Sequence, residues 1–290
     1  MRALLIYMLA LMTGFNIFGE NRALLVGIGR YQPGTGWSEI HGDADVDLLL
    51  PILTKNGYND TITLKNSKAT KSAIVNALKS LATRCKAGDK VYFHFSGHGQ
   101  PVADINGDEG KKGFDEAIVP YDAYKTITSK INGKFYNGEN HLIDDELNSL
   151  FARIKDNLGS HGEFFIAIDA CYSDDMERAS DTDEALLPPT RGTSDKLNIK
   201  RDATSMGRHK PKPFLPGAKM YVVSACKSNE CNFEYKASDG NTYGSLTYFI
   251  FLLMNKTTDF YKWTHGIETK TPSSPEIFQV YQHPQTRIYR

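Results

Sequence analysis

The stretch VYFHFSGHGQ, residues 91–100, begins as an apolar run and ends with His98 between two glycines. A second stretch, FFIAIDACYS at residues 164–173, repeats this design and places Cys171 after its apolar run. Short apolar runs bounded by small and polar residues predict buried β-strands. Each strand would therefore present a reactive side chain just beyond its carboxyl end, and the arrangement of the two strands decides whether these side chains meet.

Around these two stretches, strand-like runs alternate with helix-like segments. Strands are predicted at residues 22–31, 61–66, 91–100, 164–173 and 218–226, and helices at residues 43–58, 70–85, 144–154 and 244–254. This alternation predicts an α/β fold in which a mostly parallel central sheet, of about six strands, is sandwiched between helices. Active sites of such sheets gather at the carboxyl ends of the strands, so we expect His98 and Cys171 to lie at one edge.

Composition limits the possible partners. The chain has 290 residues, 40% of them hydrophobic, which is enough for a sizeable core. Its 34 basic and 34 acidic residues give a formal net charge of zero. No overall field therefore favours a nucleic acid or an anionic membrane as a partner.

The N-terminus is typical of a targeting segment. Arg2 precedes an apolar run over residues 3–18 that ends in small and polar residues. Residues 1–19 are predicted to be a signal peptide, which leaves residues 20–290 as a single exported domain, periplasmic or secreted, with no membrane contact after removal. The alternative is an uncleaved anchor, although the run is shorter than the ~20 residues that span a bilayer comfortably.

The four cysteines are too few for a disulfide scaffold. Cys226 and Cys231 are close enough in sequence to pair, but buried free thiols explain them equally well. Residues 178–216 are rich in Asp, Thr, Ser, Pro and basic residues and nearly lack large apolar ones, so we expect a long exposed loop.

The two strand ends supply the parts of a nucleophilic site. A cysteine nucleophile needs a thiolate, which a neighbouring imidazole can generate, so Cys171 and His98 form a candidate catalytic pair. The backbone amides of Gly99 and Cys171 could form an oxyanion hole for a tetrahedral intermediate. Taken singly, a buried cysteine is usually a small hydrophobic residue and a lone histidine is usually structural; the joint placement favours function. His94 lies on the strand itself and is expected to be a core residue.

These residues carry a family resemblance. SGHG at residues 96–99 and DACYS at residues 169–173 resemble the histidine and cysteine boxes of caspase-like cysteine peptidases of the C14 type, closest to bacterial metacaspases, also called orthocaspases. Further segments resemble that family in order: ALLVGIGRY, HGDADVDLL, DINGDEGKKGFDEAIVPYD, SACKSNECNFE and YGSLTYFIFLL. The resemblance covers roughly residues 22–255. It implies a caspase-like fold, a Cys171 nucleophile, a His98 general base and acid, and hydrolysis of peptide or protein substrates through an acyl-enzyme without a required cofactor.

The first residue of the cysteine box predicts specificity. Animal caspases have Gln-Ala-Cys around the nucleophile, whereas this chain has Asp169 two residues before Cys171. A carboxylate there would repel acidic side chains and pair with Arg or Lys before the scissile bond, with Arg preferred for its planar fork. The resemblance places Ser228 near a second pocket carboxylate of some metacaspases, and Ser224 and Ser228 are assigned to the same substrate pocket. The alternative for Asp169 is a cap or turn residue.

The resemblance also divides the chain into a large-subunit-like region (residues 20–177), the loop of residues 178–216 and a small-subunit-like region (residues 217–290). Caspase relatives are often cut in this loop, and a peptidase of basic specificity could cut itself there. The candidate sites are Arg191, Lys196, Lys200, Arg201, Arg208 and Lys210. The alternative is that these charges only keep the loop soluble.

The acidic segment after the histidine box suggests a cation. Hard oxygen ligands suit calcium, and metacaspases are commonly calcium-activated; the candidate ligands are Asp104, Asp108, Glu109 and Asp115. A solvated acidic loop is the alternative. The rival to an enzyme is a catalytically silent binding or signalling module that keeps the fold.

Overall fold

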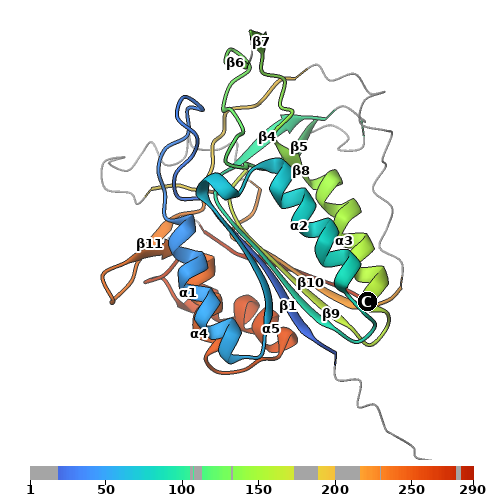
Figure 1. The fold of residues 1–290 in the computed structure, drawn as a ribbon. Helices are drawn as coiled ribbons and strands as arrows, with labels where there is room; N and C mark the ends of the chain where they lie inside the picture. Colours follow the sequence, from blue (N-terminus) through green and yellow to red (C-terminus); the bar gives the residue numbers. More distant parts are fainter. Residues whose placement is uncertain are drawn as a thin grey trace, which may run out of the picture.

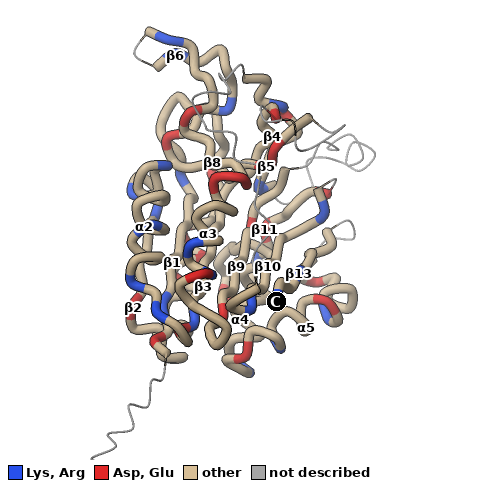
Figure 2. The backbone as a smooth tube through the Cα atoms, turned by 90° about the vertical axis from the view of Figure 1, so that its right-hand side faces the viewer, with Lys and Arg blue, Asp and Glu red and all other residues tan. Residues whose placement is uncertain are grey.

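The computed structural model describes residues 19–104, 107, 113–131, 133–172, 189–199, 216–228, 230–278 and 282–290. The predicted signal peptide therefore lies outside the described residues except for Gly19. Over the described ranges, none of the helices combines the length and the apolar character that crossing a membrane requires. Figure 2 shows the positions of Lys and Arg and of Asp and Glu interspersed along the backbone, in line with the zero formal net charge.

A six-stranded sheet in the order β13-β10-β9-β3-β1-β2 runs through the molecule (Figure 1). Every pairing in it is parallel except that of β10 with β13. Its strands are β1 (Asn21–Gly27), β2 (Asp60–Lys65), β3 (Lys90–Ser96), β9 (Glu163–Asp169), β10 (Lys219–Ser224) and β13 (Gln285–Tyr289). The predicted α/β fold with a mostly parallel sheet of about six strands is confirmed.

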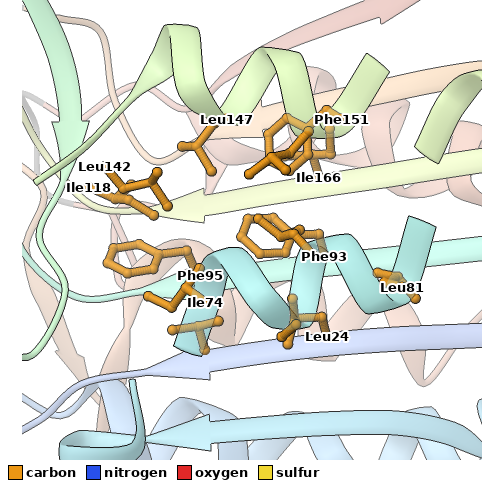
Figure 3. Close-up of a cluster of buried hydrophobic side chains, with 14 of the residues drawn as sticks. Leu24, Ile74, Leu81, Phe93, Phe95, Ile118, Leu142, Leu147, Phe151 and Ile166 are labelled. Atoms are coloured by element: carbon orange, nitrogen blue, oxygen red, sulfur yellow. The ribbon is translucent and has the colours of Figure 1, made fainter. Parts of the chain in front are cut away.

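Helices cover both faces of this sheet. They are α1 (Gly42–Lys55), α2 (Lys71–Arg84), α3 (Asp144–Leu158), α4 (Ser245–Met254) and α5 (Phe260–Lys270). Figure 1 shows α2 and α3 on one face and α1, α4 and α5 on the other. Alternate residues of a strand point to opposite faces, so Phe93 and Phe95 pack in the core under α2 and α3 (Figure 3), whereas Tyr92 packs in the core on the α1 side.

Local signals agree with the helix boundaries. The Thr70 side chain accepts a hydrogen bond from the Ala73 amide and caps α2, as an N-cap threonine does. Helix α1 ends before Gly57, whose φ of 87° lies in the left-handed region that favours glycine after a helix. The same helix begins with Asp43 and Asp45 in its first turn. That turn places Asp45 at the carboxyl edge of the sheet.

Several short strands extend the fold beyond that edge. The predicted strand at residues 91–100 ends at Ser96, and a separate strand begins at Gly99. The acidic segment also contains a strand, where only a loop was expected. The short strands are β4 (Gly99–Ala103), β5 (Phe114–Ile118), β6 (Lys130–Ile131), β7 (Lys134–Phe135), β8 (Leu142–Ile143), β11 (Glu234–Lys236) and β12 (Thr242–Gly244). The order β4-β5-β8 forms a small sheet above the main one.

The expected exposed loop at residues 178–216 needs correction at residues 189–199. Within this described part, Arg191, Leu197 and Ile199 are buried. The Leu197 amide donates to the carbonyl of Pro101 at 2.9 Å, which joins the segment to β4. Exposure was expected because the segment has few large apolar residues, but tertiary hydrogen bonds and ion pairs hold it instead.

Candidate active site

The carboxyl ends of β3, β9 and β10 meet at one edge of the sheet. Ser96 at the end of β3 lies opposite Asp169 at the end of β9. Beyond them the two chain segments touch: a Cβ added to Gly99 would lie 2.4 Å from the carbonyl oxygen of Cys171. The segments that carry His98 and Cys171 are therefore in backbone contact, and only a glycine fits at position 99.

His98 is enclosed by aromatic rings. Its side chain is 1% exposed, its ring stacks on Trp37 at a centroid distance of 5.0 Å, and its amide donates to the Tyr31 hydroxyl at 2.7 Å. Its Nε2 lies 3.0 Å from the carbonyl oxygen of Ser38. A carbonyl only accepts, so Nε2 carries the proton and Nδ1 keeps a free lone pair; Nδ1 has no hydrogen-bond partner among the described residues. Burial lowers the pKa of His98 to about 4, so the ring is neutral at neutral pH.

Cys171 follows β9 by two residues and is 3% exposed. Its Sγ donates to the carbonyl oxygen of Glu230 at 2.8 Å. Its backbone pairs with Gly192, and a Cβ added to Gly192 would lie 2.8 Å from the Cys171 Cβ. The segment of residues 189–199 thus passes directly against the cysteine.

The carbonyl of Arg191 lies between the two amides that the sequence assigned to an oxyanion hole. The Gly99 amide donates to it at 3.3 Å and the Cys171 amide at 2.9 Å. The Arg191 amide in turn donates to the Asn232 carbonyl at 2.9 Å. Both backbone polar groups of Arg191 are therefore held by the site.

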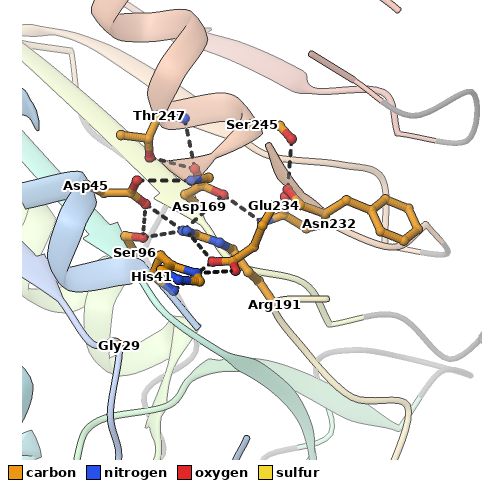
Figure 4. Close-up of polar contacts among 12 residues, drawn as sticks. Gly29, His41, Asp45, Ser96, Asp169, Arg191, Asn232, Glu234, Ser245 and Thr247 are labelled. Carbon is orange, nitrogen blue, oxygen red and sulfur yellow. Dashed lines mark hydrogen bonds and ion pairs between the residues drawn. The ribbon is translucent and has the colours of Figure 1, made fainter. Parts of the chain in front are cut away.

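The Arg191 side chain is fully buried in an acidic pocket (Figure 4). Its Nη1 donates to Asp45 Oδ2 at 2.6 Å and to the Ser96 hydroxyl, and its Nη2 donates to Glu234 Oε1 at 2.9 Å. Asp169 Oδ1 lies 3.8 Å from Nη1. Burial opposes the charge of the guanidinium, but Asp45, Asp169 and Glu234 outweigh it and raise the pKa of Arg191 further. Three carboxylates surround one cation.

The pocket carboxylates are held by other elements. Asp169 accepts from the Asn232 amide group at 2.7 Å and from the backbone amide and hydroxyl of Thr247 at 2.8 and 2.6 Å. Glu234 accepts from the backbone amide of His41, and its Oε2 lies 2.7 Å from Nδ1 of that ring. These contacts hold Asp169 at the pocket wall and, through the Thr247 amide, at the N-terminus of α4.

The pKa of Asp45 is shifted from its ordinary value. Burial, and secondarily the charge of Asp169, raise its pKa to about 6, although Arg191 and hydrogen bonds from Ser96 and the Gly244 amide oppose this shift. The Gly244 amide donates to Asp45 Oδ1 at 3.0 Å. A Cβ added to Gly244 would lie 2.1 Å from Asp169 Oδ2, so this position needs the bare backbone.

Sequence reasoning missed four of these features: Asp45, Ser96, Glu234 and the burial of Arg191. Asp45 stands among other acidic residues in the first turn of a helix, where a favourable position for carboxylates explains it without a pocket. Glu234 follows the cysteine-rich stretch with no local signal. Only the packing of α1, β11 and the segment of residues 189–199 brings them together.

The other predicted substrate residues lie elsewhere. Ser224 and Ser228 line a cavity of ≈ 1140 Å³ between α3 and the strands β9, β10 and β13. Asp45, Asp169 and Glu234 do not line that cavity. The structure therefore does not bring Ser224 and Ser228 to the Arg191 guanidinium.

The predicted calcium ligands are only partly described. Asp104 accepts a hydrogen bond from the Gly107 amide at 2.7 Å, and Asp115 lines the cavity with Glu116 and Asp144. Asp108 and Glu109 lie outside the described residues. Carboxylates are the donors that calcium prefers, but no three His, Cys, Asp or Glu side chains of the described ranges converge closely enough to hold an ion.

Cys226 and Cys231 are buried and form no disulfide, which agrees with the thiol alternative given for them. His94 lies in the core between the Tyr92 and Thr247 hydroxyls, at 3.0 and 3.1 Å, as expected. Lys196 lies over the Phe114 ring. Lys200, Arg201, Arg208 and Lys210 lie outside the described residues.

Comparisons with known proteins agree with the sequence boxes. The family described as "Metacaspase, peptidase C14 domain" matches residues 21–180. Metacaspase-1 of Meyerozyma guilliermondii is 26% identical over 198 residues, which are 65% of this chain and 42% of that protein. Metacaspase-1A of Aspergillus fumigatus is 28% identical over 195 residues, 67% of this chain and 40% of that protein. The chain thus spans about two fifths of the length of these relatives.

Two further matches cover a shorter part of the chain and the fold, respectively. Metacaspase-2 of Arabidopsis thaliana is 38% identical over 104 residues, 36% of this chain and 21% of that protein. A crystal structure of a Geobacter sulfurreducens protein superposes with a TM-score of 0.65 at 20% identity and covers 93% of both chains. The structural match supports the fold.

Proposed function

Because this chain belongs to the metacaspase family of C14 peptidases, we propose that it is a cysteine endopeptidase that cleaves after arginine and cuts its own chain between Arg191 and Gly192. The observation that carries the proposal is the position of Arg191. Its carbonyl oxygen accepts from the Gly99 and Cys171 amides while its guanidinium pairs with Asp45 and Glu234. This is the position that a substrate arginine would take before cleavage.

Each residue has a defined role in the proposed reaction. His98 Nδ1 takes the proton of the Cys171 thiol, and the thiolate attacks the Arg191 carbonyl carbon. The amides of Gly99 and Cys171 stabilise the negative oxygen that forms. His98 then gives the proton to the nitrogen of Gly192, the peptide bond breaks, and Arg191 is left as a thioester on Cys171. Water, deprotonated by His98, hydrolyses this thioester and restores the thiol.

The pocket favours arginine over lysine. One guanidinium nitrogen donates to Asp45 and Ser96 while the other donates to Glu234. A lysine ammonium is a single point and cannot occupy both nitrogen positions at once. Acidic side chains would bring a like charge into a pocket of three carboxylates and are excluded.

Self-processing is tested with the full chain and matched variants. We expect the wild type to yield a fragment that begins at Gly192, identified by N-terminal sequencing. Cys171→Ala and Arg191→Ala should abolish this cut, whereas Lys196→Ala in the same segment should keep it. A cut that persists in Cys171→Ala would overturn the proposal. Peptides that differ only before the scissile bond should then be hydrolysed in the order Arg, Lys and far behind them Asp.

A second candidate function is a silent module of the same fold. It is favoured by the closed site, in which His98 and Cys171 are 1% and 3% exposed and the chain's own Arg191 fills the pocket. An arginine-containing electrophile that alkylates active-site thiols separates the two candidates. The peptidase predicts labelling of Cys171 after the segment is cut; the silent module predicts none.

A further inference from the structure

Two thiols converge on one backbone oxygen beside the proposed nucleophile. Cys171 Sγ and Cys226 Sγ both donate to the carbonyl oxygen of Glu230, at 2.8 and 3.2 Å. Groups that share an acceptor at these distances lie within a few ångströms of each other. We propose that Cys171 and Cys226 form a reversible disulfide when the protein meets a hydroperoxide, which blocks the nucleophile and protects it from further oxidation.

The strand order makes this bond geometrically feasible. β9 and β10 are parallel neighbours with Ser224 opposite Ile168. Cys171 follows the end of β9 by two residues and Cys226 follows the end of β10 by two residues, and in this register Cys226 falls opposite residue 170, one position before Cys171. Adjacent strands lie about 4.8 Å apart and successive residues rise about 3.3 Å, so an offset of one residue gives Cα atoms about 6 Å apart, within the about 4.4–6.8 Å that a disulfide needs. The two thiols can therefore join without separating the strands.

The side chain of Glu230 anchors the loop that carries the shared carbonyl oxygen. Glu230 accepts from the backbone amides of Lys227 and His283 at 3.2 and 2.9 Å. Its carboxylate also pairs with the side chains of both residues. Glu230 is therefore anchored from two sides, which holds its carbonyl oxygen beside both sulfurs.

The cavity between α3 and the strands reaches Cys226, whereas Cys171 is not among its lining residues. Cys226 lines this cavity, whose volume is ≈ 1140 Å³. The hydrogen bond with Cys171, followed by burial, raises the pKa of the Cys226 thiol. Cys226 therefore stays protonated and is suited to the second step of the reaction rather than the first.

The chemistry balances with the hydroperoxide as the oxidant. His98 takes the proton of the Cys171 thiol, and the thiolate attacks the terminal oxygen of the hydroperoxide. The O–O bond breaks and the leaving oxygen takes the proton from His98, so the products are a sulfenic acid on Cys171 and an alcohol, or water from hydrogen peroxide. The Cys226 sulfur then attacks the sulfenic sulfur and a water molecule leaves with the Cys226 proton. A dithiol reverses the bond by thiol–disulfide exchange.

Trypsin digestion can distinguish the possible pairs. Cleavage after Lys155, Arg178, Lys219, Lys227 and Lys236 separates Cys171, Cys226 and Cys231 onto the peptides 156–178, 220–227 and 228–236. After treatment of the folded chain with hydrogen peroxide and alkylation of free thiols, we expect peptide 156–178 linked to peptide 220–227. A link between 220–227 and 228–236 instead would overturn the proposal.

Activity adds a second readout, which rests on the proposed function of Cys171. The wild type and the control Cys231→Ser should lose activity in peroxide. Both should recover roughly 80% of it in dithiothreitol, because a dithiol reduces a disulfide. Cys226→Ser should lose activity irreversibly, because Cys171 then proceeds to sulfinic acid. Equal recovery in Cys226→Ser and wild type would contradict the proposal. If no variant hydrolyses peptides at all, the proposed function fails, and the peptide map still decides the disulfide.

Discussion

The Glu234 carboxylate contacts two residues, Arg191 and His41. Oε1 accepts from Arg191 and from the His41 amide, while Oε2 lies beside the His41 ring. The side chain is fully buried. A buried carboxylate that loses its charge leaves its cationic partner underpaired. Its replacement therefore tests the pocket directly.

We expect Glu234→Gln to lower kcat/KM for arginine substrates by about tenfold or more, since each 1.4 kcal/mol of lost binding is tenfold. Lysine substrates should lose less, because their ammonium can remain at the Asp45 position, so the Arg-to-Lys preference narrows. Paired kinetics on peptides that differ only at this residue measure the effect. Glu276→Gln at an exposed position is the control; an unchanged Arg-to-Lys ratio in Glu234→Gln would contradict the assigned role.

Asp45 gives the pocket a pH dependence. Its pKa is raised to about 6, so the carboxyl is charged above that pH and becomes neutral as the pH falls through it. This pKa includes the effect of the Arg191 guanidinium in the pocket and therefore applies to the site with an arginine bound. Neutral Asp45 pairs less strongly with a guanidinium, so kcat for arginine peptides should fall below about pH 6. His98, with a pKa of about 4, stays a neutral base over this range.

Asp45→Asn should therefore remove the decline near pH 6 as well as lower activity at neutral pH. Asp47→Asn on the same helix is the matched control, because Asp47 is exposed and pairs with Lys65. A pH–rate profile of each variant measures the effect. If Asp45→Asn keeps the wild-type acid limb, another group titrates there.

At the scale of elements, the start of α4 orients the pocket. Thr247 donates to Asp169 with both its amide and its hydroxyl. The helix therefore presents its N-terminus, where backbone amides are unpaired, to a carboxylate. This couples an element of the C-terminal third of the chain to the strand that carries Cys171.

We expect Thr247→Val to raise KM for arginine peptides about fivefold, the cost of roughly one hydrogen bond to the Asp169 carboxylate; the variant also removes the hydroxyl beside His94 Nε2. The backbone bond remains, so the protein should still fold. Thr264→Val in α5 is the control: this buried hydroxyl bonds only the Phe260 carbonyl among the described hydrogen bonds, far from the site in sequence. Equal KM changes in the two variants would show a general loss of packing instead.

At the scale of the whole molecule, the proposed cut does not divide the core. β9 precedes Arg191 and β10 follows it, yet the two strands are neighbours in the central sheet. Both cores contain residues from before and after the cut. The two fragments should therefore elute together in native size-exclusion chromatography and separate only in denaturant. Separation under native conditions would contradict this expectation.

Calcium dependence stays a prediction from the acidic segment. Chelation should depress peptidase activity, and added calcium should restore it, measured with the same arginine peptides. Magnesium at equal concentration is the control, because it demands a smaller and more regular site. Indifference to chelation would reduce the segment to a structural role.

The fold could be predicted from the sequence because its signals are local. The apolar runs at β1, β3, β9 and β10 and the helical periodicity between them do not depend on distant partners. β13 was missed: its residues QTRIY are mostly polar and form an edge strand, whose half-exposed surface requires no apolar pattern. β13 runs antiparallel to β10, and this pairing alone fixes its place in the sheet.

The sequence by itself determined the alternation of strands and helices, and it placed His98, Cys171 and Asp169 at strand ends that a parallel sheet brings together. The tertiary structure alone decided that Asp45, Glu234 and Arg191 share a pocket. A strand end is fixed by the pattern of its own neighbours, but the pairing of charges 146 residues apart depends on the packing of whole elements. Burial then makes this charge pairing necessary, because a guanidinium removed from water requires carboxylates around it.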